Sequence, residues 1–205
     1  RIQSGFYSGV SAIEEQVALY RCLAEGSAQY AAELAGLKVL AVQGGSLPGI
    51  VTRERLVRSL ADLRGLRIRV PTELLNVMRA LGADPVNMPM GEVYSALAKG
   101  VIDGLVAPTD TFRSLHLAEV SRYYTQLRVW RGAYPARAMG EARWHALSPA
   151  HRAVLEEGIA IWEQALADEN RRALEEGWRL AQREGVQHAA VSDADQRRFD
   201  ALYQR

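Results

Sequence analysis

The sequence predicts an α/β protein with mainly parallel sheets and one exceptionally long helix. Between positions 67 and 107, short apolar strands alternate with helices of about ten residues, the pattern of βαβ units. An uninterrupted helical pattern then runs over 149–184, and such a helix would be roughly 54 Å long at 1.5 Å per residue. That length suits an element bridging two lobes better than one confined to a single small lobe.

The N-terminal part is expected to contain a strand, two helices and a second strand. The apolar run 2–10, with two glycines, indicates a strand and a turn. Ser11 and Glu14 have the capping-box spacing, which favours a helix start. A second helix is expected over 27–34. The apolar run 38–43 is typical of a strand covered on both faces in a parallel sheet.

The remaining elements are predicted from the spacing of apolar residues, which differs between helices and strands. The glycine-rich stretch 44–49 is expected to be a loop; it lacks the GxxxxGK spacing and opens no helix, so a phosphate site is not predicted. A helical turn precedes a series of strands at 67–70, 84–88, 104–107 and 186–191, with helices at 72–81, 91–100 and 115–124 and an extended segment at 127–134. Ser192 is expected to cap the last helix.

Composition excludes several classes of function. Lys and Arg number 25 against 24 Asp and Glu, so the net charge of +1 predicts neither nucleic acid nor an anionic membrane as a partner. Cys22 is the single cysteine, which excludes an internal disulfide, and we expect its thiol to be buried. The four histidines show no metal-ligand spacing, so neither a metal site nor a cofactor is predicted.

No catalytic motif is present. Ser46 follows two glycines, but the GxSxG pattern of a nucleophile elbow is absent because Pro48 occupies the last position. Asp103 precedes a glycine at a helix-to-strand corner, where aspartate commonly bonds local backbone groups. We therefore predict no catalytic residue and no enzyme.

Arg69 is the strongest candidate for ligand binding. Charged and apolar residues alternate from Arg67 to Val70, which places Arg67 and Arg69 on one face of a strand. Arg69 stands at the carboxyl end, just before Pro71 and a helix, and ligands of open α/β sheets bind outside that end. Its planar fork of donors suits a carboxylate. The alternative is a solvated arginine on an edge strand.

Five short blocks resemble one known family. In order they read DLRGLRIRVP at 62–71, LGA at 81–83, MP at 88–89, GEVYSAL at 91–97 and GVIDG at 100–104. Their order and spacing resemble the DctP-type solute-binding proteins of tripartite ATP-independent periplasmic (TRAP) transporters. Weaker similarity continues through 117–125 and the Trp144 to Pro149 entry into the long helix.

The resemblance implies a two-lobe, periplasmic-binding-protein-like fold with the long helix crossing both lobes. Lobe one is expected at 1–47 and 135–175, and lobe two, which carries the arginine, at 48–134 and 176–205. The family pattern begins earlier than this sequence does, so the N-terminal portion of lobe one is expected to be missing.

The same resemblance implies a periplasmic protein that captures a small carboxylate. Its partners would be the integral-membrane TRAP permease subunits, which are sodium-coupled and receive the ligand. No cofactor is implied. The alternatives are an enzyme acting on an organic acid and a ligand-sensing subunit of a signalling system.

Six residues form the expected ligand site. The family's carboxylate-clamping arginine corresponds to Arg69. Thr72 and Glu73 follow at the helix start, where backbone N–H groups favour an anion. The others fall where family members line the pocket, namely Met90, Ala107 and Thr111. Ordinary packing at strand ends is the alternative for these neighbours.

Two departures from the family pattern bear on the ligand. Ala107 stands where many members have asparagine, and Gly49 stands where a second arginine often occurs. Both changes remove a polar partner, and Glu73 would repel a second carboxylate. The expected ligand is therefore a monoacid rather than a dicarboxylate.

Overall fold

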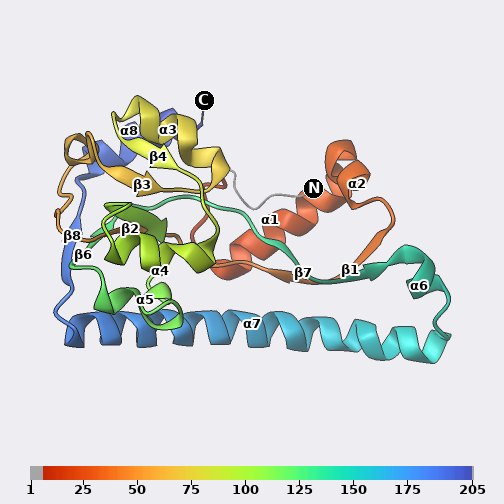
Figure 1. Ribbon diagram of the computed structural model, residues 1–205. Helices are drawn as coiled ribbons and strands as arrows, with labels where there is room; N and C mark the ends of the chain where they lie inside the picture. The colour runs from red at the N-terminus through yellow and green to blue at the C-terminus, as the bar shows by residue number, and fades with distance from the viewer. Residues whose placement is uncertain (1–6, 205) are drawn as a thin grey trace. The chain divides into compact units, whose positions relative to one another are not determined.

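The computed structural model describes residues 7–204, which divide into two compact units. Within that range, unit 1 comprises 7–46 and 130–172, and unit 2 comprises 47–129 and 173–204. The ribbon in Figure 1 shows both α-helices and β-strands, and the predicted α/β class is confirmed. Most of the strand expected at 2–10 lies outside the described residues, and 7–10 form no strand.

Unit 2 is built on a six-stranded sheet of order β4-β3-β5-β2-β6-β8. The strands are β2 (Gly49–Thr52), β3 (Arg67–Arg69), β4 (Asp84–Val86), β5 (Gly104–Ala107), β6 (Tyr123–Gln126) and β8 (Gln187–Ala190). Three pairings are parallel, β3 with β4, β3 with β5, and β6 with β8. Only β2 runs antiparallel to its neighbours β5 and β6. The predicted βαβ units at 67–107 are therefore confirmed.

Helices cover both faces of this sheet. They are α3 (Leu75–Ala80), α4 (Met90–Ala98), α5 (Thr111–Ser114), α8 (Asp193–Tyr203) and the last part of α7 (Pro149–Arg183), with 3-10 turns at Leu60–Leu63, Thr72–Leu74 and Leu117–Glu119. Alternate strand residues divide between two buried clusters, because successive side chains point to opposite faces. Ile50 and Val106 belong to one cluster, and Val51, Leu105 and Ala107 to the other.

Local signals explain where the helices of unit 2 end and begin. Gly82 and Gly100 have φ values of +84° and +71° just after α3 and α4, in the left-handed region that glycine adopts without strain. The Ser192 side chain accepts a hydrogen bond from the backbone N–H of Asp195 at 3.1 Å, which confirms the predicted cap of α8.

Unit 1 contains a smaller, two-stranded sheet. Its elements are α1 (Ile13–Gly26), α2 (Ala28–Leu34), β1 (Leu37–Gln43), β7 (Tyr134–Gly140), α6 (Glu141–His145) and the first part of α7. β1 and β7 pair antiparallel, so the expectation of a parallel strand at 38–43 is wrong. An apolar run shows that a strand is buried, but it does not fix the direction of the partner strand.

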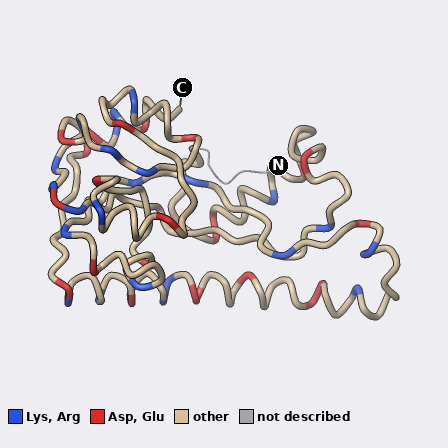
Figure 2. Tube along the Cα trace, viewed as in Figure 1, with Lys and Arg blue, Asp and Glu red and all other residues tan. Residues whose placement is uncertain are grey.

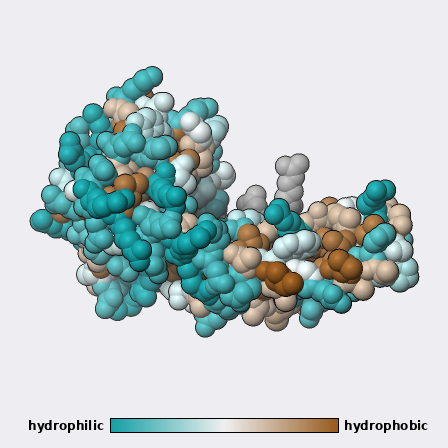
Figure 3. All heavy atoms as spheres, turned by 90° about the horizontal axis from the view of Figure 1, so that it is seen from below, coloured by the Kyte–Doolittle hydropathy of each residue, from teal (hydrophilic) through white to brown (hydrophobic). Residues whose placement is uncertain are grey.

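Helix α7 has 35 residues, which confirms the long helix predicted from 149 onward. Val154 and Ile161 are 66% and 70% exposed on its unit 1 part, and Figure 3 shows hydrophobic side chains gathered over this part of the helix. Cationic and anionic residues are interspersed along the described chain (Figure 2). The two kinds of charge are nearly equal in number, which gives the net charge of +1.

Several local predictions are wrong. The segment 115–124 is not one helix but a 3-10 turn followed by strand β6, in which aromatic and β-branched residues favour a strand. In the segment 127–134, predicted to be extended, residues 127–133 pair in no strand and only Tyr134 belongs to one, β7. Ala12 rather than Ser11 is the N-cap of α1, and no side chain caps it. Cys22 is exposed on α1 rather than buried.

The carboxyl group of Asp62 makes part of the stability of unit 2 depend on pH. It accepts hydrogen bonds from the backbone N–H of Arg58 and of Ser59, both at 2.9 Å, and from the Ser59 hydroxyl at 3.0 Å. The bond from Arg58, reinforced by those from Ser59, holds the pKa of Asp62 below its ordinary value.

We expect Asp62→Asn to lower the free energy of unfolding most near neutral pH. Because the folded-state pKa is depressed, the carboxylate stabilises the fold above the unfolded-state pKa of about 3.9. This contribution is lost as the pH falls through the folded-state value. Urea unfolding of both proteins between about pH 7 and pH 3 should show the difference shrinking toward acid. A difference that does not change with pH would contradict this assignment.

Candidate functional site

One edge of the unit 2 sheet gathers the predicted site residues. The parallel strands β3, β4 and β5 all end at this edge, and β2 begins there because it runs the opposite way. Arg69 pairs with Leu105, and Ala107, two residues farther along β5, pairs with Gly49. Paired residues project to the same face of a sheet, as do residues two apart on one strand. Arg69, Ala107 and Gly49 therefore share one face at the carboxyl end of the sheet.

Arg69 is held by its inner nitrogen, which leaves its outer fork free. Its side chain is half-buried, and its Nε donates a hydrogen bond to the carbonyl oxygen of Met88 at 3.1 Å. Among the described residues, no acceptor is bound to its two terminal nitrogens. Burial lowers the pKa of Arg69, an effect that Glu73 partly offsets. The site thus presents a partly desolvated guanidinium, always charged at ordinary pH, with a fixed stem.

Thr72 and Glu73 lie on the 3-10 turn that follows β3. The Thr72 hydroxyl accepts a hydrogen bond from Asn87 Nδ2 at 3.3 Å, and the same amide nitrogen donates to the carbonyl of Val70 at 3.2 Å. Asn87 therefore ties the end of β3 to the segment after β4. Sequence reasoning missed this residue because no local pattern distinguishes it.

The other three predicted residues differ in exposure. Met90 begins α4 and is half-buried. Ala107 and Thr111 are only 2% and 6% exposed, and the Thr111 hydroxyl donates to the carbonyl of Pro108 at 2.6 Å. Ala107 packs in the cluster on the Arg69 face of the sheet. Contact of these six residues with a ligand stays a prediction.

Gly49 has no room for a side chain. A Cβ atom placed on it would lie 2.5 Å from the carbonyl oxygen of Thr125 and 2.6 Å from the hydroxyl oxygen of Tyr124. Non-bonded atoms do not approach so closely, so the backbone of β6 would have to move. Tyr124 escaped sequence reasoning because its segment was predicted to be helical, which hides its alternation along a strand.

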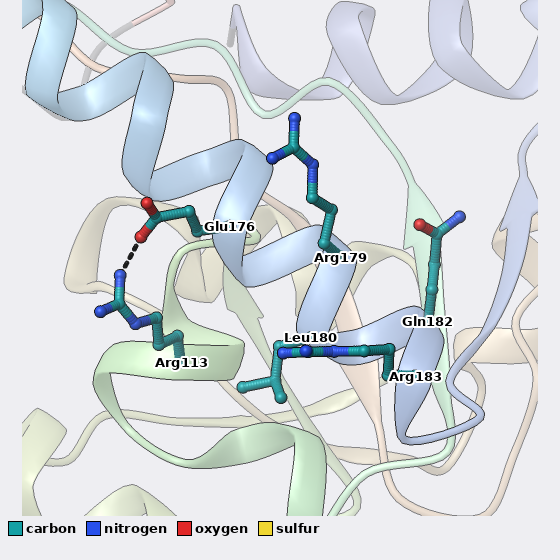
Figure 4. A pocket seen from close by; sticks show the side chains of 6 residues that line it. All are labelled: Arg113, Glu176, Arg179, Leu180, Gln182 and Arg183. Atoms are coloured by element: carbon teal, nitrogen blue, oxygen red, sulfur yellow. Dashed lines mark hydrogen bonds and ion pairs between the residues drawn. The ribbon is translucent and has the colours of Figure 1, made fainter.

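Two further pockets lie outside this group of residues, one in each unit. On unit 2, an open cavity of about 870 Å³ is lined by Arg113, Glu176, Arg179, Leu180, Gln182 and Arg183. Figure 4 shows Arg113 of α5 reaching the carboxylate of Glu176 on α7, with which it forms an ion pair. The lining is exposed and of mixed charge, and it contains none of the six predicted residues.

The second pocket, of about 250 Å³, lies in unit 1 between α1, the end of β1 and α7. Glu163 is a charged residue in the lining of this pocket, and it forms two hydrogen bonds with other parts of unit 1. Its Oε1 atom accepts from the backbone N–H of Val42 at 2.8 Å and from Arg21 at 2.5 Å. Through this oxygen, Glu163 on α7 is linked to both β1 and α1 within the unit.

Residues 7–204 contain no group of three or more His, Cys, Asp or Glu side chains that could hold a metal ion. Within the same range, no helix combines the length and the apolar character needed to cross a bilayer.

A sequence profile decides the family. The profile described as bacterial extracellular solute-binding protein, family 7 (DctP), matches residues 14–205, nearly the whole chain. The chain belongs to this family. Its members are binding proteins of transport systems rather than enzymes, and both the predicted family and the predicted absence of an enzymatic role are confirmed.

Curated relatives agree with this membership. The 2,3-diketo-L-gulonate-binding periplasmic protein YiaO of Escherichia coli is 29% identical over 175 residues, which are 82% of this chain and 51% of that protein. A solute-binding protein of Roseobacter denitrificans is 38% identical over 103 residues, 49% of this chain and 31% of its own length. The chain thus spans about half of the length of these relatives, or less. Relatives named as periplasmic confirm the predicted localisation for this family.

Solved structures of TRAP solute-binding proteins share the fold. A marine metagenome protein specific for aromatic acid ligands, in complex with metahydroxyphenylacetate, is 28% identical with a TM-score of 0.80. The alignment covers 98% of this chain and 64% of that protein. A protein from Desulfovibrio salexigens is 25% identical with a TM-score of 0.79, covering 98% and 61%.

Proposed function

We propose that the protein is the periplasmic solute-binding component of a TRAP transporter, capturing a small organic acid and delivering it to a sodium-coupled permease. The observation that carries this proposal is the state of Arg69. Its stem is anchored to Met88, and its terminal nitrogens are free in a partly buried place at the carboxyl end of the sheet. The free terminal nitrogens can donate two parallel hydrogen bonds to a carboxylate, and the anchored stem fixes where this pair forms.

We propose further that units 1 and 2 correspond to the two lobes of the family. Lobe one would take 1–47 and 135–175. Lobe two would take 48–134 and 176–205 and would carry Arg69. The division of the described chain into units that each have two segments supports this assignment.

The ligand is proposed to be a monocarboxylate. Gly49 and Ala107 offer no charged group to a second carboxylate, and Glu73 places a negative charge near Arg69. The ligands in the names of two relatives agree with this class. One relative is named for 2,3-diketo-L-gulonate, and the other was solved with metahydroxyphenylacetate and with 3-hydroxybenzoate.

A thermal-shift screen of organic acids on the full-length protein tests the proposal. We expect one or more monocarboxylates to raise the melting temperature, because a ligand at 100 times its Kd stabilises the native state by about 2.7 kcal/mol. The best ligands should be recovered unchanged after prolonged incubation with the protein. Formation of a product would contradict a binding function, and the absence of any stabilising acid would contradict the ligand class.

A further inference from the structure

Tyr124 is a buried aromatic residue whose polar end has no partner. It lies on β6 and is 8% exposed. Phe112, Trp178 and His188 surround its ring, with centroid distances of 5.9, 5.7 and 6.0 Å. Such contacts fix the plane and direction of the phenol. A buried tyrosine normally finds a hydrogen-bond partner, because an unpaired polar group inside a protein destabilises the fold.

The Tyr124 hydroxyl finds no such partner in the described chain. It forms no hydrogen bond with any residue of 7–204. Its oxygen is also not fully enclosed by protein atoms. The hydroxyl therefore reaches solvent at the tip of an otherwise enclosed ring. It lies over Gly49, 2.6 Å from the place that a Cβ would take. The missing side chain of Gly49 is what gives the hydroxyl its space.

Register places this hydroxyl on the same side of the sheet as Arg69. Tyr124 pairs with Val51, and Val51 pairs with Leu105 of β5. Leu105 in turn pairs with Arg69, so all four side chains project from the same face of the sheet. β2 begins with Gly49 at the carboxyl end of the sheet, and Val51 lies two residues farther from that end. The Tyr124 backbone is beside Val51 and its hydroxyl is over Gly49, so the phenol points toward the carboxyl end of the sheet. The strands β3 and β2 are separated only by β5, so about 10 Å of sheet lies between Arg69 and the hydroxyl.

We propose that the Tyr124 hydroxyl donates a hydrogen bond to a neutral polar group of the ligand, at the end opposite the carboxylate that Arg69 holds. This inference rests on the proposed function and names its substrate class, a monocarboxylate that carries a hydroxyl or carbonyl oxygen several ångströms from its carboxylate. The span between the two protein groups suits a small acid, since the arginine side chain covers part of the distance.

The protonation state of the phenol supports this role. Burial raises the pKa of Tyr124 to about 12. The hydroxyl therefore keeps its proton at physiological pH and acts as a neutral donor. A neutral phenol cannot offset the charge of a second carboxylate, so a dicarboxylate would be bound less well than a hydroxylated monoacid.

The test compares Tyr124→Phe with wild type in the full-length protein, by calorimetric titration of four monoacids and one dicarboxylate. These are 3-hydroxybenzoate and benzoate, and 3-hydroxyphenylacetate and phenylacetate; succinate serves as the dicarboxylate. Wild type should prefer the hydroxylated member of a pair by about five- to tenfold, the net effect of one hydrogen bond. Tyr124→Phe should remove this preference by weakening the hydroxylated acid, with less than about a twofold change for the other member.

Tyr123→Phe is the matched control, because Tyr123 is the neighbouring residue on β6 and points to the opposite face. It should preserve the preference. An unchanged preference in Tyr124→Phe, or tighter binding of succinate than of the hydroxylated acids, would overturn the role of Tyr124 while leaving the capture of acids by Arg69 intact. If wild type binds none of the four monoacids, the substrate class named here is wrong. The proposed function itself fails if no acid of the wider screen binds, or if a bound acid is converted to a product.

Discussion

Replacing Arg69 by alanine should weaken the binding of an organic acid at least tenfold. The guanidinium is half-buried and its terminal nitrogens are unpaired in the described chain, so the fork can meet both oxygens of a carboxylate. Hydrogen bonds to charged groups contribute about 1.5–3 kcal/mol each, and 1.4 kcal/mol corresponds to one decade in Kd. Calorimetric titration with the best acid from the screen measures this loss directly.

Two further variants separate geometry from charge. Arg69→Lys should recover only part of the affinity, because an ammonium keeps the positive charge but loses the planar fork. Arg67→Ala is the matched control on the same face of β3. Its side chain is 53% exposed and lies 3.6 Å from Asp84, away from the carboxyl end of the strand. If Arg67→Ala abolished binding and Arg69→Ala did not, the clamp would be assigned to the wrong arginine.

Replacing Gly177 by alanine should destabilise unit 2 by about 1–3 kcal/mol, the usual cost of overpacking a close contact. Gly177 lies on α7, and a Cβ there would be 2.2 Å from the carbonyl oxygen of Thr109 and 2.8 Å from the Cα of Asp110. The Thr109 hydroxyl also donates to the carbonyl of Leu174 at 3.1 Å, so the loop and the helix are held together at this point. Backbone atoms cannot step aside as a flexible side chain can. Chemical denaturation measures the loss.

Gly158 provides the control within the same helix. A Cβ on Gly158 would meet only the Trp162 ring, at 3.8 Å, which is an ordinary contact. Alanine in a helix is favoured over glycine by about 0.5–1 kcal/mol, so Gly158→Ala should stabilise the protein. Equal effects of the two substitutions would show that α7 does not pack closely against the loop at 109–110.

The elements that sequence predicted correctly are those with an unambiguous local signal. The alternation around Arg69 identified β3, the periodic pattern from Pro149 identified α7, and Ser192 marked the start of α8. These signals depend on residues close together in the chain. They can therefore be recognised in the sequence without any knowledge of tertiary contacts.

The errors arise where a partner strand decides the outcome. The direction of β1 depends on β7, which lies about a hundred residues away in the sequence, and β6 gains its strand structure by pairing with both β2 and β8. The sequence singled out Gly49 as an expected departure from the family pattern. That the Tyr124 phenol fills the space beside it could not be predicted, because the two residues are 75 positions apart (124 minus 49) and meet only through the sheet register.

The central claim is that Arg69 binds the carboxylate of a small acid, and a crystal structure of the full-length protein with the best acid from the screen tests it most directly. We predict that the two carboxylate oxygens lie about 2.7–2.9 Å from the two terminal nitrogens of Arg69, the distance of a charge-assisted bidentate pair. The Nε hydrogen bond to Met88 should persist, since it fixes the stem. A ligand whose carboxylate is bound elsewhere, with Arg69 left in contact with solvent or protein alone, would contradict the claim.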